Sequence, residues 1–82
     1  MKSYSARVRV SIKPEVSDPE GDVICAALRN LEFNTVDSVR TGKHFQIVVR
    51  ADSRDDALSE VDGMCRKLLA HPLVENYLVE LE

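Results

Sequence analysis

The sequence predicts a single α+β domain over residues 1–82, with its elements in the order strand–helix–strand–strand–helix–strand. Two observations predict this class. Polar and apolar residues alternate near both ends and in the middle of the chain, and two stretches between them carry apolar residues three and four positions apart. The composition agrees with a globular domain, because 44% of residues are hydrophobic, 30% are charged, and the net charge is −3.

The first strand is expected over residues 4–12, where every second side chain is apolar. Pro14 ends it, because proline has no amide proton to donate to a sheet. Asp18 is expected to cap the first helix, with Pro19 at its first position, where the missing donor is tolerated. The apolar stripe of this helix is expected to pack in the core, and it consists of Val23, Ile24, Ala27, Leu28 and Leu31.

A hairpin is expected in the middle of the chain. Residues 35–40 form a short and weakly patterned strand, and residues 44–51 form a second strand with clear alternation. Thr41 and Gly42 make the turn between them, with Gly42 supplying a positive φ angle.

The second helix is expected to begin after Ser53, which caps it, and to end before Pro72. A final strand follows over residues 75–82, with Tyr77, Val79 and Leu81 directed inward. The apolar stripe of the second helix consists of Ala57, Leu58, Val61, Met64, Cys65 and Leu68.

This order corresponds to a ferredoxin-like βαββαβ fold, a four-stranded sheet with two helices on one face. The first and last strands are then antiparallel neighbours, which brings Arg7 and Arg9 on the outer face of the sheet near Glu80. Four apolar residues are expected in the core, where truncation costs about 1–5 kcal/mol: Val10, Leu28, Ile47 and Leu68.

Several classes of protein are disfavoured. The longest apolar run, residues 23–28, is too short to span a membrane, and the start of the chain lacks the apolar core of a signal peptide, so a cytoplasmic location is expected. The acidic charge argues against binding to nucleic acid. No nucleophile elbow, P-loop or dinucleotide-binding glycine run is present. An 82-residue domain buries only about 60% of its unfolded surface, so a binding or assembly role is favoured over independent catalysis.

The cysteines and histidines give weak signals for chemistry. Cys25 and Cys65 form no Cys-x-x-Cys pair and are expected to be small buried residues on the helices. A nucleophilic pair of either one with His44 is disfavoured for the same reason. His71 could be a ligand or a proton carrier, but a position closing the second helix is favoured. We therefore expect no catalytic, cofactor-binding or metal-binding residue in this chain.

Two surfaces are candidates for binding. The segment Arg40–Lys43 could hold an anion at a glycine turn, although a solvated turn is the favoured interpretation. The outer face of the sheet mixes polar and apolar groups and lacks the aromatic residues that stack on RNA, which is typical of a protein–protein surface, with a solvated face as the alternative. The candidate partner contacts are Arg7, Arg9, Arg40 and Lys43.

Three segments carry a resemblance to a known family. Residues 13–21 read KPEVSDPEG and resemble the "KPxVxDPxG" opening of the PurS subunits of phosphoribosylformylglycinamidine (FGAM) synthase. Residues 39–43, VRTGK, match its "VRxGK" segment, and residues 64–77, MCRKLLAHPLVENY, resemble its "MCxKLLANPVxExY" ending. Two positions depart from the pattern, with His71 in place of asparagine and Glu32 in place of a common glycine.

The resemblance implies a small non-catalytic subunit of a ligase in the fourth step of purine biosynthesis. There, formylglycinamide ribonucleotide, glutamine and ATP give formylglycinamidine ribonucleotide. The implied partners are a glutaminase subunit (PurQ) and a synthetase subunit (PurL), which the small subunit assembles and between which it helps ammonia to pass. The complex uses ATP, Mg and glutamine, and the small subunit binds no cofactor. A homodimer or homotetramer is implied, with no nucleic-acid or membrane partner.

The alternative function is a regulatory module of the ACT type, which shares the order of strands and helices and binds amino acids at a dimer interface. Only the analogy of fold supports it.

Overall fold

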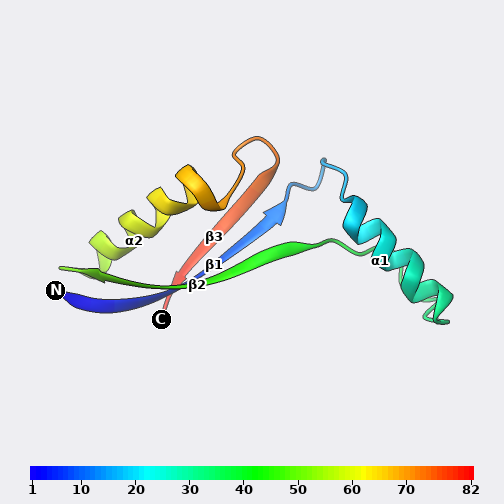
Figure 1. The fold of residues 1–82 in the computed structure, drawn as a ribbon, viewed down its shortest axis with the longest axis horizontal. Helices are drawn as coiled ribbons and strands as arrows, with labels where there is room; N and C mark the ends of the chain where they lie inside the picture. Colours follow the sequence, from blue (N-terminus) through cyan, green and yellow to red (C-terminus); the bar gives the residue numbers. More distant parts are fainter.

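The computed structural model describes residues 1–82 as three strands and two helices (Figure 1). A five-residue π-helical turn, η1, continues the second helix. The elements are β1 (Lys2–Ile12), α1 (Pro19–Asn30), β2 (Gly42–Ala51), α2 (Arg54–Met64), η1 (Cys65–Leu69) and β3 (Glu75–Leu81). No helix is long and apolar enough to cross a membrane.

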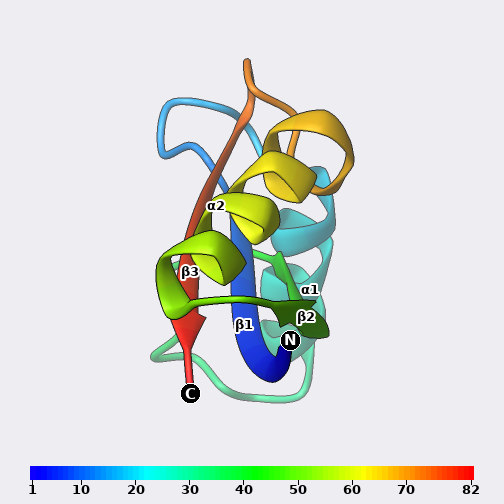
Figure 2. The ribbon, with the colours of Figure 1, turned by 90° about the vertical axis from the view of Figure 1, so that its left-hand side faces the viewer.

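The strands form one antiparallel sheet in the order β2–β1–β3, with β1 in the centre. Its inner face is apolar, and Val8 stands there between Phe45 of β2 and Val79 of β3. This confirms the alternation predicted for the first strand and its antiparallel pairing with the last. Helix α2 covers this face (Figure 2). The buried core between them is small, and it consists of Ala6, Val8, Val10, Val61, Cys65 and Ala70.

The predicted four-stranded sheet is wrong, because residues 35–40 form no strand. Two of their carbonyl groups bond to α1 instead: the Arg29 guanidinium donates to the Val36 carbonyl from Nε at 3.0 Å and from Nη2 at 2.8 Å, and to the Asp37 carbonyl from Nη2 at 3.2 Å. The predicted hairpin turn is absent too. Gly42 is the first residue of β2, opposite Ser11, and no glycine has a positive φ angle.

Helix α1 extends beyond the end of the sheet, so the prediction of two helices on one face is also wrong (Figure 1). The chain measures 52 × 24 × 14 Å, and its radius of gyration of 16.5 Å exceeds the value of about 12 Å for a compact chain of this length. The apolar stripe of α1 is largely exposed, with Val23 69% and Leu31 67% accessible. Leu28 is only half-buried and does not belong to the core.

The end of α2 also differs from the predicted stripe. Helix α2 begins as expected, since the Ser53 hydroxyl accepts a hydrogen bond from the Asp56 amide at 3.1 Å. At η1 the backbone widens, and the Ala70 amide bonds the Cys65 carbonyl five residues back at 3.0 Å. The wider turn shifts the inward position by one residue, so Leu69 packs against the core and Leu68 is 83% exposed. The prediction of Leu68 as a core residue is therefore wrong.

Helix α1 ends in a turn that favours glycine. The Phe33 amide bonds the Leu28 carbonyl and the Glu32 amide bonds the Arg29 carbonyl, which is the hydrogen-bond pattern of a Schellman motif. The residue at the left-handed position of this motif is Glu32, with φ 74°. This is the position at which the resembling family commonly has glycine.

We expect Glu32→Gly to stabilise the chain by about 1 kcal/mol, because glycine adopts a positive φ angle without a clash of its side chain. Chemical denaturation of the two proteins measures this difference. A Glu60→Gly variant in the exposed part of α2 serves as control and should be destabilised by about 1 kcal/mol. A loss of stability in Glu32→Gly would contradict the prediction.

Candidate interaction surfaces

Two segments that are 18 or more residues apart in the sequence meet where α1 leaves the sheet. We call them the joint: residues 13–21, which lead from β1 into α1, and residues 39–41, which lead into β2. At its centre lies Asp18, with 2% of its surface exposed. Its carboxylate accepts hydrogen bonds from the Thr41 amide at 2.6 Å, the Thr41 hydroxyl at 2.9 Å and the Gly21 amide at 2.9 Å.

These hydrogen bonds determine the charge of the joint. Donors from the Thr41 and Gly21 amides favour the carboxylate and lower the pKa of Asp18 below its ordinary value of 3.8, and the nearby Arg40 guanidinium acts in the same direction. Asp18 is therefore an anion at neutral pH. It caps α1, as the sequence predicts, and it also bonds Thr41, just before β2, which the sequence does not reveal.

Gly21 and Arg40 complete the joint. A Cβ atom at Gly21 would lie 2.2 Å from the Val39 carbonyl oxygen, so the two segments can approach this closely only with glycine there. The Arg40 guanidinium donates to the Lys13 carbonyl at 2.9 Å and to the Val16 carbonyl at 2.7 Å. The segments KPEVSDPEG and VRTGK thus form one hydrogen-bonded unit that fixes where α1 projects.

The structure separates the four predicted contact residues. Arg9, Arg40 and Lys43 line one shallow hollow of about 410 Å³ at the beginning of β2. Arg7 lies further along the outer face of the sheet, where its Nε atom pairs with Glu82 Oε1 at 2.7 Å. The Arg40 guanidinium is already engaged by the Lys13 and Val16 carbonyls. A role of the four residues in contacts with a partner stays a prediction.

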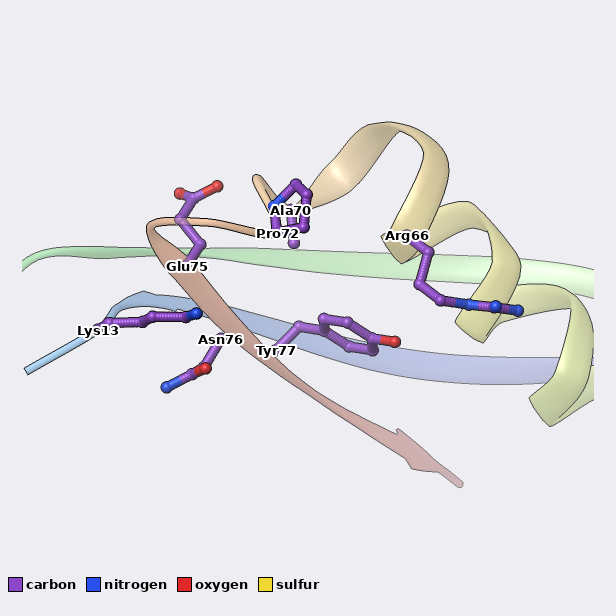
Figure 3. Close-up of a pocket in the computed structure, with 7 residues that line it drawn as sticks. All are labelled: Lys13, Arg66, Ala70, Pro72, Glu75, Asn76 and Tyr77. Carbon is purple, nitrogen blue, oxygen red and sulfur yellow. The ribbon is translucent and has the colours of Figure 1, made fainter.

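A second hollow, of about 540 Å³, lies between η1 and the beginning of β3 (Figure 3). The Tyr77 hydroxyl donates to Asp62 Oδ1 at 2.5 Å on one side, and this hydrogen bond raises the pKa of Tyr77. Arg66 Nε pairs with the other oxygen of Asp62 at 2.9 Å. The residues that line the hollow are Lys13, Arg66, Ala70, Pro72, Glu75, Asn76 and Tyr77.

His71 forms the turn beside this hollow. Its Nδ1 atom accepts a hydrogen bond from the Leu73 amide at 3.3 Å, and its own amide donates to Glu75 Oε1 at 2.7 Å. An asparagine side chain could accept the same bond from Leu73, so the departure from the family pattern preserves the turn. No three His, Cys, Asp or Glu side chains gather closely enough to hold a metal ion.

The cysteines differ in their surroundings. Cys65 is fully buried in the core, as predicted, and this burial raises the pKa of its thiol. Cys25 lies half-buried on α1, with its sulfur 3.9 Å from the Asp37 carbonyl oxygen. Both are free thiols.

The fold and these surfaces define an elongated α+β chain that exposes apolar side chains on one helix and one turn, as subunits of larger assemblies do. The family model described as PurS, phosphoribosylformylglycinamidine (FGAM) synthase, matches residues 5–82. The chain belongs to the PurS family.

Two PurS subunits are similar in sequence to nearly the whole chain. The PurS subunit of Archaeoglobus fulgidus is 43% identical and covers 90% of this chain and 92% of the relative. The PurS subunit of Bacillus subtilis is 40% identical, and the match covers 96% of this chain and 93% of the relative.

Solved structures agree in fold. Methanocaldococcus jannaschii PurS, one of the subunits of formylglycinamide ribonucleotide amidotransferase in the purine biosynthetic pathway, matches with a TM-score of 0.85 and 38% identity over 96% of this chain and 95% of that one. A chain in the structure of PurLQS from Thermotoga maritima matches with a TM-score of 0.91 and 30% identity over 100% of both.

Proposed function

We propose that this chain is the small assembly subunit of FGAM synthase, which joins a glutaminase subunit (PurQ) to a synthetase subunit (PurL) and helps ammonia to pass between them. The observation that carries the proposal is its likeness, over its full length, to a chain of the PurLQS structure. The glutamine, ATP and magnesium ion of the reaction would bind to the other two subunits, and a cytoplasmic location is part of the proposal.

Self-association is the second part of this proposal. Only 10 of the 82 residues are buried, and the exposed stripe of α1 projects away from the sheet that it was expected to cover. On the inner face of the sheet, α2 leaves Phe45, Ile47 and Val49 half-exposed. A second copy could place its α1 on that face, which would bury apolar surface on both chains. We therefore expect a homodimer, or a homotetramer built from two such dimers.

Mixing the purified chain with the glutaminase and synthetase subunits tests the first part. With formylglycinamide ribonucleotide, glutamine, ATP and magnesium, we expect glutamine-dependent synthesis only when all three proteins are present. The synthetase supplied with ammonium salt instead of glutamine is the control for its own activity. Equal glutamine-dependent rates with and without this chain would rule the proposal out.

The comparisons do not favour the ACT-type alternative. Calorimetric titration of the isolated chain with amino acids checks it directly. Binding in the micromolar range would support that alternative, and the absence of heat would agree with an assembly subunit.

A further inference from the structure

Helix α1 and the chain that returns from it leave the sheet together. We call this part, residues 19–38, the arm. None of its residues belongs to the buried core or to the apolar side chains packed against the core. In Figure 1, α1 continues beyond the end of the sheet. Packing against its own sheet therefore does not set the direction of the arm.

The arm is held together by its own hydrogen bonds. The Arg29 guanidinium donates to the Val36 carbonyl at 2.8 Å and to the Asp37 carbonyl at 3.2 Å, which fastens the returning chain to α1. The sulfur of Cys25 lies 3.9 Å from the same Asp37 carbonyl oxygen. The arm can thus turn as one body about the joint, where both of its ends meet the rest of the chain.

Arg40 and Thr41 fasten the two ends of the arm to each other. Arg40 lies on the chain that returns from the arm, and its Nη2 atom donates to the Lys13 and Val16 carbonyls on the chain that enters it. The Thr41 amide and hydroxyl donate to Asp18, the residue that caps α1. Hydrogen bonds that span 23 to 27 residues therefore cross-link the base of the arm.

A small change of angle at the joint is amplified along the arm. Helix α1 has 12 residues and is therefore about 18 Å long. A turn of about 20° about its first residue would move its far end by about 6 Å. Apolar side chains are in contact only within about 4.5 Å, so such a turn would separate the exposed stripe of α1 from a surface that it fits.

We propose that Arg40 and Thr41 are positioning residues for self-association, because their hydrogen bonds across the joint hold the arm at the angle at which its apolar stripe meets the sheet of a second copy. The occupant is a second copy because one chain exposes both surfaces: the stripe, with Val23 69% and Leu31 67% accessible, and the half-exposed apolar residues of β2. An arm that is fixed before association loses little conformational freedom on binding, so the joint raises the affinity. This inference rests on the self-association within the proposed function.

Two substitutions release the joint in different ways. Arg40→Met removes the guanidinium and keeps a long side chain, and Thr41→Val removes the hydroxyl and keeps a branched one. Neither residue belongs to the core, so both variants should keep the wild-type circular dichroism spectrum. Ser53→Ala is the matched control, because it also removes a side-chain hydrogen bond but lies at the opposite end of β2 from the joint.

Sedimentation equilibrium of the purified chain measures the dissociation constant of the self-associated form, and chemical denaturation measures the stability of each variant. We expect Arg40→Met and Thr41→Val each to raise the dissociation constant at least tenfold, and Ser53→Ala to raise it less than threefold. Thr41 is uncharged and half-buried, so a matching effect of the two substitutions identifies the joint, and not the charge of Arg40, as the cause.

The outcomes separate this inference from the proposed function. A wild-type chain that stays monomeric would disprove self-association, and the inference would fail with it. If the wild-type chain associates and either joint variant associates as tightly, only the inference fails. It also fails if Ser53→Ala weakens association as much as the joint variants do, since a general loss of stability would then explain the effect.

Discussion

Replacing Gly21 with alanine is expected to open the joint and to lower the free energy of unfolding by about 2–3 kcal/mol. The added Cβ would lie 2.2 Å from the Val39 carbonyl oxygen and 3.0 Å from the Asp18 carboxylate. Because Val39 contributes a main-chain atom, it cannot rotate away as a side chain could. The segment that carries Thr41 must shift, and its hydrogen bonds to Asp18 weaken as it does so.

Chemical denaturation measures the loss, and hydrogen exchange shows where it occurs. We expect faster exchange of the Gly21 and Thr41 amides and of α1, with protection retained in β1. The matched control is Gly63→Ala in α2, where nothing lies within 4 Å of the added Cβ. That variant should gain about 0.5–1 kcal/mol from helix propensity. If Gly21→Ala proved as harmless as Gly63→Ala, the close approach at the joint would be disproved.

Replacing Asp18 with alanine is expected to remove the hydrogen bonds at the centre of the joint and to change how the stability of the chain depends on pH in acid. The substitution leaves the buried Gly21 amide and the partly buried Thr41 amide without their acceptor and removes the cap of α1. In the wild-type chain the pKa of Asp18 is lowered, so its stabilising contribution is fully present above the ordinary value of 3.8. That contribution disappears as the pH falls through the lowered pKa.

The wild-type protein should therefore lose stability more steeply below about pH 4 than Asp18→Ala, and the two curves should converge in acid. Thermal unfolding between pH 2 and pH 7 gives both curves. Asp55→Ala, in the first turn of α2, is the control because no side-chain hydrogen bond involves its carboxylate, and it should keep the acid response of the wild type. Parallel curves for wild type and Asp18→Ala would contradict the role assigned to Asp18.

The joint gives a physical reason for two of the three segments that resemble the family. Asp18 and Gly21 from the first segment meet Val39, Arg40 and Thr41 from the second, through contacts that need these side chains or the absence of one. Their combined effect is to project α1 away from the sheet. The third segment forms η1 and the turn before β3, and it supplies two core residues, Cys65 and Ala70, as well as the exposed Leu68 and Leu73.

Local patterns predicted the parts of the fold that depend on neighbouring residues. The alternation along β1 follows from the two faces of a strand, and the caps at Asp18 and Ser53 follow from side chains that bond amides within one turn. Local patterns did not predict how the joint is built. The bonds from Asp18 to Thr41 and from Arg40 to Lys13 span 23 and 27 residues, and no local pattern encodes them.

The sequence by itself determined the identities of the central and final strands, the starts of both helices and the family, because these depend on periodicity, capping and short motifs. Only the tertiary structure decided that residues 35–40 lie along α1 instead of in the sheet, that α1 leaves the sheet, and that Leu69 replaces Leu68 in the core. An apolar stripe shows which side of a helix will be covered, but not by which chain. Likewise, one wider turn after Cys65 is enough to change which leucine faces inward.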